Sequence, residues 1–136
     1  MQIAGITFIV GELEGFRFIE TIFPESLDRT RLWAAASSYP TMWDEAKATV
    51  TLNDVSQMGR LSIEATGVLR WVLQQNSLRA LIIGTSWVTG SNDGAREQIT
   101  GVLRDVGRSD ETIFQQRDEA IAHLRREIAR WTEEQR

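Results

Sequence analysis

The chain has 136 residues, of which 42% are hydrophobic and 25% are charged, and its formal net charge is −4. This length and composition are typical of one soluble globular domain, and the acidic balance argues against nucleic acid as the main partner. The chain has no cysteine and a single histidine, His123, which excludes disulfides, thiolate metal sites and multi-histidine metal sites. We therefore expect no cofactor.

Two strands are predicted at the N-terminus. Residues 3–10 are β-branched and aromatic, residues 16–23 alternate, and the short polar connection between them favours an antiparallel hairpin. No basic stretch precedes the first strand, as it would in a signal peptide. No apolar run approaches the roughly 20 residues that span a bilayer. These features predict a cytoplasmic protein without membrane insertion, and we expect a prokaryotic one.

A helix is predicted over residues 27–39, with Ser26 as its N-cap and Pro40 as its end. The side chains expected on one face of this helix are those of Leu27, Arg31, Ala34, Ala35 and Ser38. A connector that carries Trp43 follows. Residues 48–52 then predict a strand, and residues 53–59 predict a polar loop.

A second helix is predicted to begin at Ser62 and to end at Asn76-Ser77. It carries an apolar stripe of helical period, formed by Leu61, Ala65, Val68, Leu69, Val72 and Leu73. Residues 78–83 are apolar apart from one arginine, which is typical of a strand covered on both faces. Residues 85–94 are polar and predict a long loop.

The C-terminal third predicts a helix over residues 95–106 that ends at Gly107, a short strand over 112–114 and a helix over 118–131. The polar tail, residues 132–136, is expected to fray. The element order is therefore β-β-α-β-α-β-α-β-α. It predicts a single α/β domain over residues 1–131, with a mixed sheet of about five strands and about four helices.

This element order resembles the STAS domain, the fold of bacterial anti-sigma-factor antagonists and of the cytoplasmic tails of anion transporters. The likeness covers nearly the whole chain and is best over residues 48–131. There a strand is followed by Asn53-Asp54-Val55-Ser56, a turn and an apolar helix, and a short strand and helix begin at Phe114. The resemblance implies a STAS-like sandwich and a regulatory role.

The functional motif of that family is Asp-Ser-Ser/Thr-Gly-apolar, and a kinase partner phosphorylates the serine after the aspartate. By spacing the motif falls here on Gly59-Arg60-Leu61-Ser62, and by residue type it falls on Glu64-Ala65-Thr66-Gly67-Val68. In the second register alanine takes the phosphoacceptor position. The candidate phosphoacceptor or anion-binding residues are Ser56, Ser62, Thr66 and Arg60, and the alternative for Ser62 is a plain N-cap.

The loop predicted after the fourth strand is a candidate ligand site, because open α/β sheets place ligands at the carboxyl ends of their strands. Its candidate residues are Thr85, Ser86, Trp87, Gly90, Ser91 and Asn92. The alternative is a capped connection without a ligand. Trp71 lies off the apolar stripe of its helix and Trp87 lies in the predicted loop, so we expect both at an interface.

Three carboxylates, Asp44, Glu45 and Asp54, flank the third strand and are the only basis for a hydrolase, which we keep as a minor alternative. We expect His123 to be structural or solvated. The leading prediction is a non-enzymatic STAS-like domain that binds a protein partner or a second copy of itself, as a dimer. The alternative is a domain of the same fold that binds a small ligand, a nucleotide or a lipid.

Overall fold

A computed structural model describes residues 1–38, 47–79 and 81–136. The strands are β1 (Gln2–Ile3), β2 (Ile6–Leu13), β3 (Phe16–Ile22), β4 (Thr49–Asp54), β5 (Ile82–Val88) and β6 (Ile113–Phe114). The helices are α1 (Arg29–Ser38), α2 (Ile63–Arg79), α3 (Asp93–Asp105) and α4 (Arg117–Glu134), with a 3-10 turn at Asp110–Thr112. The predicted α/β architecture is confirmed, with six strands in place of about five.

The sheet has the order β1-β2-β3-β4-β5-β6. The first three strands are antiparallel, and β3 through β6 run parallel. The extra strand arises because Ala4 and Gly5 both adopt a positive φ, so the predicted first strand folds back on itself in a tight turn. The parallel half of the sheet therefore directs the carboxyl ends of four strands to one edge.

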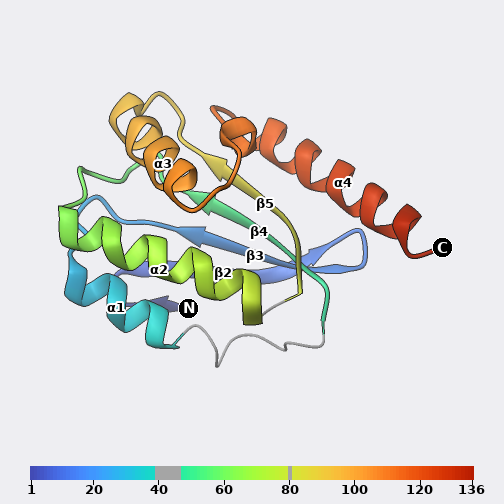
Figure 1. Cartoon of the computed structure of the whole chain (residues 1–136), viewed down its shortest axis with the longest axis horizontal. Helices are drawn as coiled ribbons and strands as arrows, with labels where there is room; N and C mark the ends of the chain where they lie inside the picture. The colour runs from blue at the N-terminus through green and yellow to red at the C-terminus, as the bar shows by residue number, and fades with distance from the viewer. Residues whose placement is uncertain (39–46, 80) are drawn as a thin grey trace.

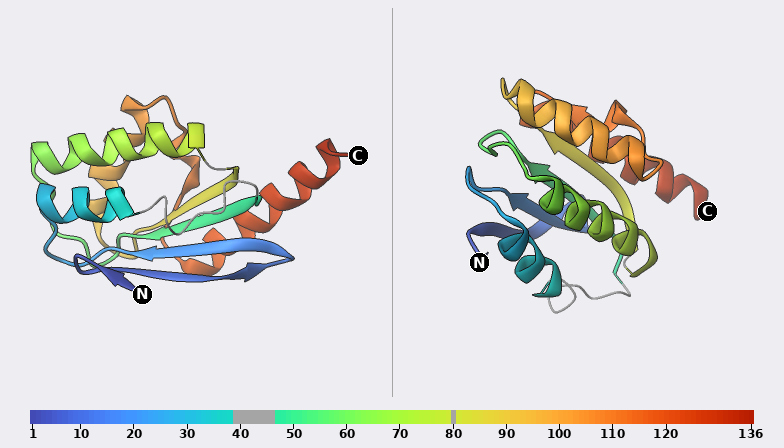
Figure 2. Two further views of the ribbon diagram at one scale, coloured as in Figure 1. Left: turned by 90° about the horizontal axis from the view of Figure 1, so that it is seen from below. Right: turned by 60° about the vertical axis from the view of Figure 1, so that its left-hand side comes forward.

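Helices cover both faces of the sheet (Figures 1 and 2). On one face α1, α2 and α3 enclose the larger core, to which Ile19, Leu69 and Ile99 belong. On the other face α4 packs alone over a smaller core, to which Leu52, Leu124 and Ile128 belong. Successive side chains of a strand point to opposite faces, so β5 contributes Trp87 to the larger core and Val88 to the smaller one.

Several predicted boundaries were wrong. The first helix begins at Arg29, and its N-cap is Asp28, whose Oδ1 accepts a hydrogen bond from the backbone N–H of Arg31 at 2.8 Å. Ser26 lies outside it. Arg31 and Ala34 are exposed, whereas Leu32 and Ala35 are buried. The predictions for residues 39–46, including Pro40, Trp43, Asp44 and Glu45, fall outside the described residues.

The largest difference is at β5, which the sequence predicted over residues 78–83. Helix α2 continues to Arg79 because no glycine or proline interrupts it after Asn76. The strand then runs over Ile82–Val88, so the loop begins at Thr89. Polar residues are stable in this strand because their side chains find partners in the neighbouring elements.

Candidate functional site

The loops that follow β4, β5 and β6 meet at the carboxyl edge of the sheet. The backbone N–H of Val55 donates to the carbonyl of Val88 at 2.9 Å, and the N–H of Gly90 donates to the carbonyl of Gln115 at 3.1 Å. Gly90 has a φ of +56°, and a Cβ atom there would lie 3.3 Å from the Cβ of Ser56. Glycine therefore permits the close approach of the two loops.

Asn92 fastens these loops together. Its Nδ2 donates to the carbonyls of Ser56 at 3.1 Å and Met58 at 2.8 Å, and its Oδ1 accepts from the backbone N–H of Ala95 at 3.1 Å. The same side chain thus caps α3 and holds the loop after β4. Because its hydrogen-bonding capacity is used within the protein, Asn92 is a structural residue of this edge, while its neighbour Ser91 is exposed.

Ser56 turns toward the protein as well. Its Oγ donates to Oδ1 of Asp54 at 2.6 Å, and its backbone N–H donates to the same oxygen at 2.9 Å. This arrangement is an Asx turn that closes the end of β4. The hydroxyl proton of Ser56 and this oxygen of Asp54 are therefore engaged with each other.

Ser62 caps α2, as the N-cap interpretation of the sequence predicted. Its Oγ accepts from the backbone N–H of Ala65 at 3.1 Å, and the residue is exposed. Ala65, which takes the phosphoacceptor position in one register of the motif, is fully buried in the larger core. A side chain at position 65 cannot meet a kinase, so the phosphoacceptor position of that register is not accessible.

Arg60 and Thr66 lie in one shallow hollow between α2 and α3, which Arg70 and Gln98 also line. The Oγ1 of Thr66 donates to the carbonyl of Ile63 at 2.8 Å, and Arg70 forms an ion pair with Asp105 at 2.9 Å. The structure therefore brings Arg60, Ser62 and Thr66 to the N-terminal half of α2. It holds Ser56 in a separate loop.

Three candidates of the predicted ligand loop lie in β5, so their assignment to a loop was wrong. The Oγ1 of Thr85 is 3.1 Å from Oγ1 of Thr51 on β4. Ser86 is fully buried, and its Oγ donates to the carbonyl of Ala120 at 3.0 Å. Trp87 is only 1% exposed, which contradicts its predicted place at an interface.

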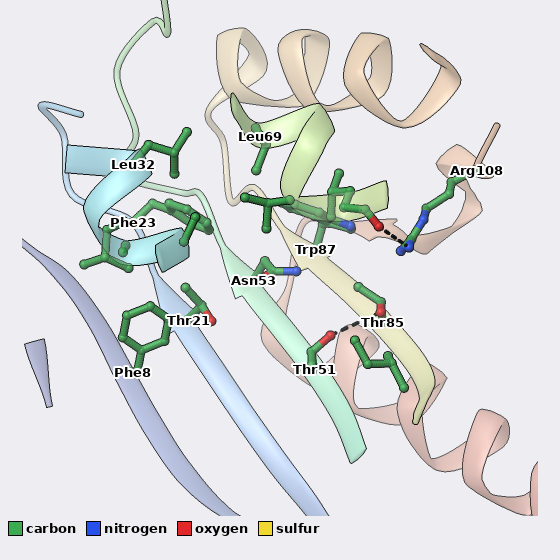
Figure 3. A pocket seen from close by; sticks show the side chains of 16 residues that line it. Phe8, Thr21, Phe23, Leu32, Thr51, Asn53, Leu69, Thr85, Trp87 and Arg108 are labelled. Carbon is green, nitrogen blue, oxygen red and sulfur yellow. Dashed lines mark hydrogen bonds between the residues drawn. The ribbon is translucent and has the colours of Figure 1, made fainter. Parts of the chain in front are cut away.

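A cavity of about 50 Å³ lies between the sheet and the helices α1 and α2 (Figure 3). Phe8, Phe23, Leu32 and Leu69 form its apolar part. The sheet contributes polar side chains, those of Thr21, Thr51, Asn53, Thr85 and Trp87, and Arg108 reaches it from beyond α3. The sequence analysis named Thr85 and Trp87 as ligand candidates, although in a loop. It missed the other polar residues, although the alternation in β4 placed a polar residue at every second position.

On the outside of the same helical layer an aromatic pair is exposed. The ring centroids of Trp33 on α1 and Trp71 on α2 are 5.1 Å apart, and the residues are 49% and 39% exposed. Ile63, two turns before Trp71 on α2, is 86% exposed. We call Trp33, Ile63 and Trp71 the tryptophan face. An open hollow of about 590 Å³ lies beside its two tryptophans, with Arg29 and Glu64 among its lining residues.

Two titratable side chains of α4, those of Arg117 and His123, contact the sheet. Nη2 of Arg117 donates to Oε1 of Glu20 at 2.8 Å, and this hydrogen bond is the main cause that raises the pKa of Arg117. His123 packs against Phe114, with ring centroids 5.3 Å apart, and burial lowers its pKa. Both groups belong to the packing of α4 against the sheet.

In the part of the chain that the structure describes, no three His, Asp or Glu side chains gather as a metal ion would require. None of the described helices combines the length and the apolar composition that a membrane span needs.

No protein-family model matches the sequence, and a comparison with curated proteins found no match. Among solved structures, the chain is similar to an anti-sigma factor antagonist from Mycobacterium paratuberculosis. The TM-score is 0.55 and the identity 16%, over 90% of this chain and 96% of that one. SLC26A9 matches with a TM-score of 0.49 and 11% identity, over 91% of this chain and 21% of that chain. The first of these likenesses confirms the predicted STAS-like fold.

Proposed function

We propose that the chain is a STAS-like regulatory domain that binds a partner protein through the tryptophan face. The observation that carries this proposal is the exposed pair of Trp33 and Trp71. Tryptophan supplies a large share of binding energy where it enters an interface, and large apolar side chains that gather on a surface commonly mark a binding site. The similarity in fold to an anti-sigma factor antagonist supports a role in protein binding.

We infer binding and not catalysis, because the polar side chains at the carboxyl edge of the sheet are engaged within the protein. The amide of Asn92 holds two loops, and a carboxylate oxygen of Asp54 accepts two hydrogen bonds from Ser56. The minor hydrolase alternative would need Asp54 to be available. The cytoplasmic location, prokaryotic origin and dimerisation stay predictions.

We also propose that a phosphate on Ser62 regulates this binding. Ser62 is exposed at the first turn of α2, the helix that carries Ile63 and Trp71. A phosphate there adds a charge of about −1.5 to −2 beside the tryptophan face, near the positive end of the helix dipole. Ser56 is the less suitable acceptor, since its hydroxyl already donates to Asp54.

Affinity capture with matched variants tests the binding proposal. The wild-type chain, the double variant Trp33→Ser/Trp71→Ser and the control Ile9→Ser are immobilised, and the captured proteins are quantified by mass spectrometry. Ile9 is a suitable control because it is 51% exposed and, by strand alternation, faces the side of the sheet opposite to Phe8.

We expect the wild type and the control to capture at least one protein in equal amounts. The double variant should capture about tenfold less of it. Circular dichroism verifies that the variants are folded, and exposed positions such as these should tolerate serine. Capture that is equal for all three chains would contradict a role of the tryptophan face.

A further inference from the structure

The side of β4 that faces α1 and α2 is polar, although a protein core is usually apolar. Thr49, Thr51 and Asn53 point toward α1 and α2 and are buried, while Val50 and Leu52 point toward α4. The neighbouring strands add Thr21 and Thr85 to the same face. Burying polar groups costs free energy unless they form hydrogen bonds, so this concentration of polar side chains requires an explanation.

Two of the polar atoms on this side of the sheet have no hydrogen-bond partner among the described residues. They are Oγ1 of Thr21 and Nε1 of Trp87, and both residues are at least 98% buried and line the cavity. Buried polar atoms of this kind are rare in native proteins and commonly mark a bound molecule. The indole N–H can only donate and a hydroxyl can do so as well, so a complementary molecule offers acceptor atoms.

Arg108 gives this cavity a positive charge. Its Nη2 donates to the carbonyl of Leu73 at 2.9 Å, burial lowers its pKa, and it forms no ion pair with any described residue. Glu111 and Glu127 border an outer groove that Arg108 also lines, but Glu127 pairs instead with Arg130 and lies near His123. Among the described residues that line the cavity, none is acidic.

We propose that this cavity binds a small monocarboxylate of the size of acetate or propionate. The carboxylate accepts hydrogen bonds from Trp87 Nε1 and the guanidinium of Arg108, and the aliphatic end packs against Leu73, whose carbonyl Arg108 also binds. A cavity of about 50 Å³ has room for roughly four water-sized groups, which matches the four or five non-hydrogen atoms of these acids. A ligand this small binds with a Kd of about 1 mM.

Heteronuclear NMR of the ¹⁵N-labelled chain tests the proposal, with propionate as the probe and propionamide as its neutral analogue. At constant ionic strength, we expect the indole N–H resonance of Trp87 to shift and saturate with propionate, while those of Trp33 and Trp71 stay in place. Propionamide should bind about tenfold more weakly, because it lacks the charge that pairs with Arg108.

Variants assign the effect to the cavity. Arg108→Gln should weaken propionate binding about tenfold, whereas Arg104→Gln, an exposed arginine in the last turn of α3, should leave it unchanged. If Arg108→Gln fails to fold, Trp87→Phe gives a second test, followed through backbone N–H resonances, and should weaken binding severalfold. Its matched control is Trp131→Phe, since Trp131 packs against Phe16 and does not line the cavity.

The proposal is overturned if the Trp87 resonance does not move at propionate concentrations about tenfold above the expected Kd. That result would mean that water alone fills the cavity. It is also overturned if Arg108→Gln, correctly folded, binds propionate as tightly as Arg104→Gln. Neither result bears on the tryptophan face, which lies on the outside of the helical layer.

Discussion

The side chain of Asn92 forms hydrogen bonds with several backbone groups at the carboxyl edge. Its replacement should therefore lower the stability of the fold. It caps α3 and donates to backbone carbonyls of Ser56 and Met58. In Asn92→Ala the cap is lost and these carbonyls lose a donor. We expect the free energy of unfolding to fall by about 2 to 3 kcal/mol, measured by urea denaturation.

The neighbouring variant Ser91→Ala serves as the control. Ser91 is exposed, so its replacement should change the free energy of unfolding by no more than about 0.5 kcal/mol. Equal stability of Asn92→Ala and Ser91→Ala would mean that the hydrogen bonds of Asn92 do not hold this edge of the sheet.

His123, the only histidine, makes stability depend on pH. Burial lowers its pKa below the ordinary 6.5, Arg126 and Arg130 lower it further, and Glu127 opposes them. The unfolded chain therefore binds this proton more tightly than the folded chain, and acidification through 6.5 destabilises the fold. We expect the free energy of unfolding to fall between about pH 7.5 and about pH 5.5, as followed by urea denaturation.

The variant His123→Gln isolates this contribution, because it removes the titrating group and leaves the other charges of α4 in place. As the pH falls, the free energy of unfolding should decrease more for the wild type than for the variant. A difference that is independent of pH would show that burial does not lower the pKa of His123.

At the scale of elements, amphipathic helices were the most predictable part of the fold. The stripe from Leu61 to Leu73 predicted the buried face of α2, and Ser62 predicted its start, because helical period and capping are local properties. The boundary between α2 and β5 was not predictable in this way. Residues 77–83 contain no glycine or proline that would mark the boundary, and the strand is fixed by its pairing with β4 and β6.

The contacts at the carboxyl edge and in the cavity were likewise not predictable from local sequence patterns. The sequence placed Gly90, Ser91 and Asn92 in a loop. It could not show that the amide of Asn92 donates hydrogen bonds to the loop after β4. Trp87 was expected at a surface because polar residues surround it, yet those neighbours find partners in β4 and α4. The contacts are long-range in the chain, and no local pattern encodes them.

At the scale of the whole molecule, the two faces of the sheet are covered in different ways. Helix α4 closes one face with an apolar core and the ion pair between Arg117 and Glu20. The other face carries the cavity beneath α1 and α2 (Figure 3), and the tryptophan face lies on the outside of these two helices. The same two helices border both features.

Site-specific photo-crosslinking tests the proposed role of the tryptophan face most directly. A photoreactive p-benzoylphenylalanine replaces Trp71 in one chain and Ile9, which is at least as exposed, in another. Both chains are irradiated in the cells from which the protein comes. The account predicts a discrete cross-link to one other protein from position 71 and none from position 9. Cross-links of equal yield from both positions, or none from position 71, would contradict it.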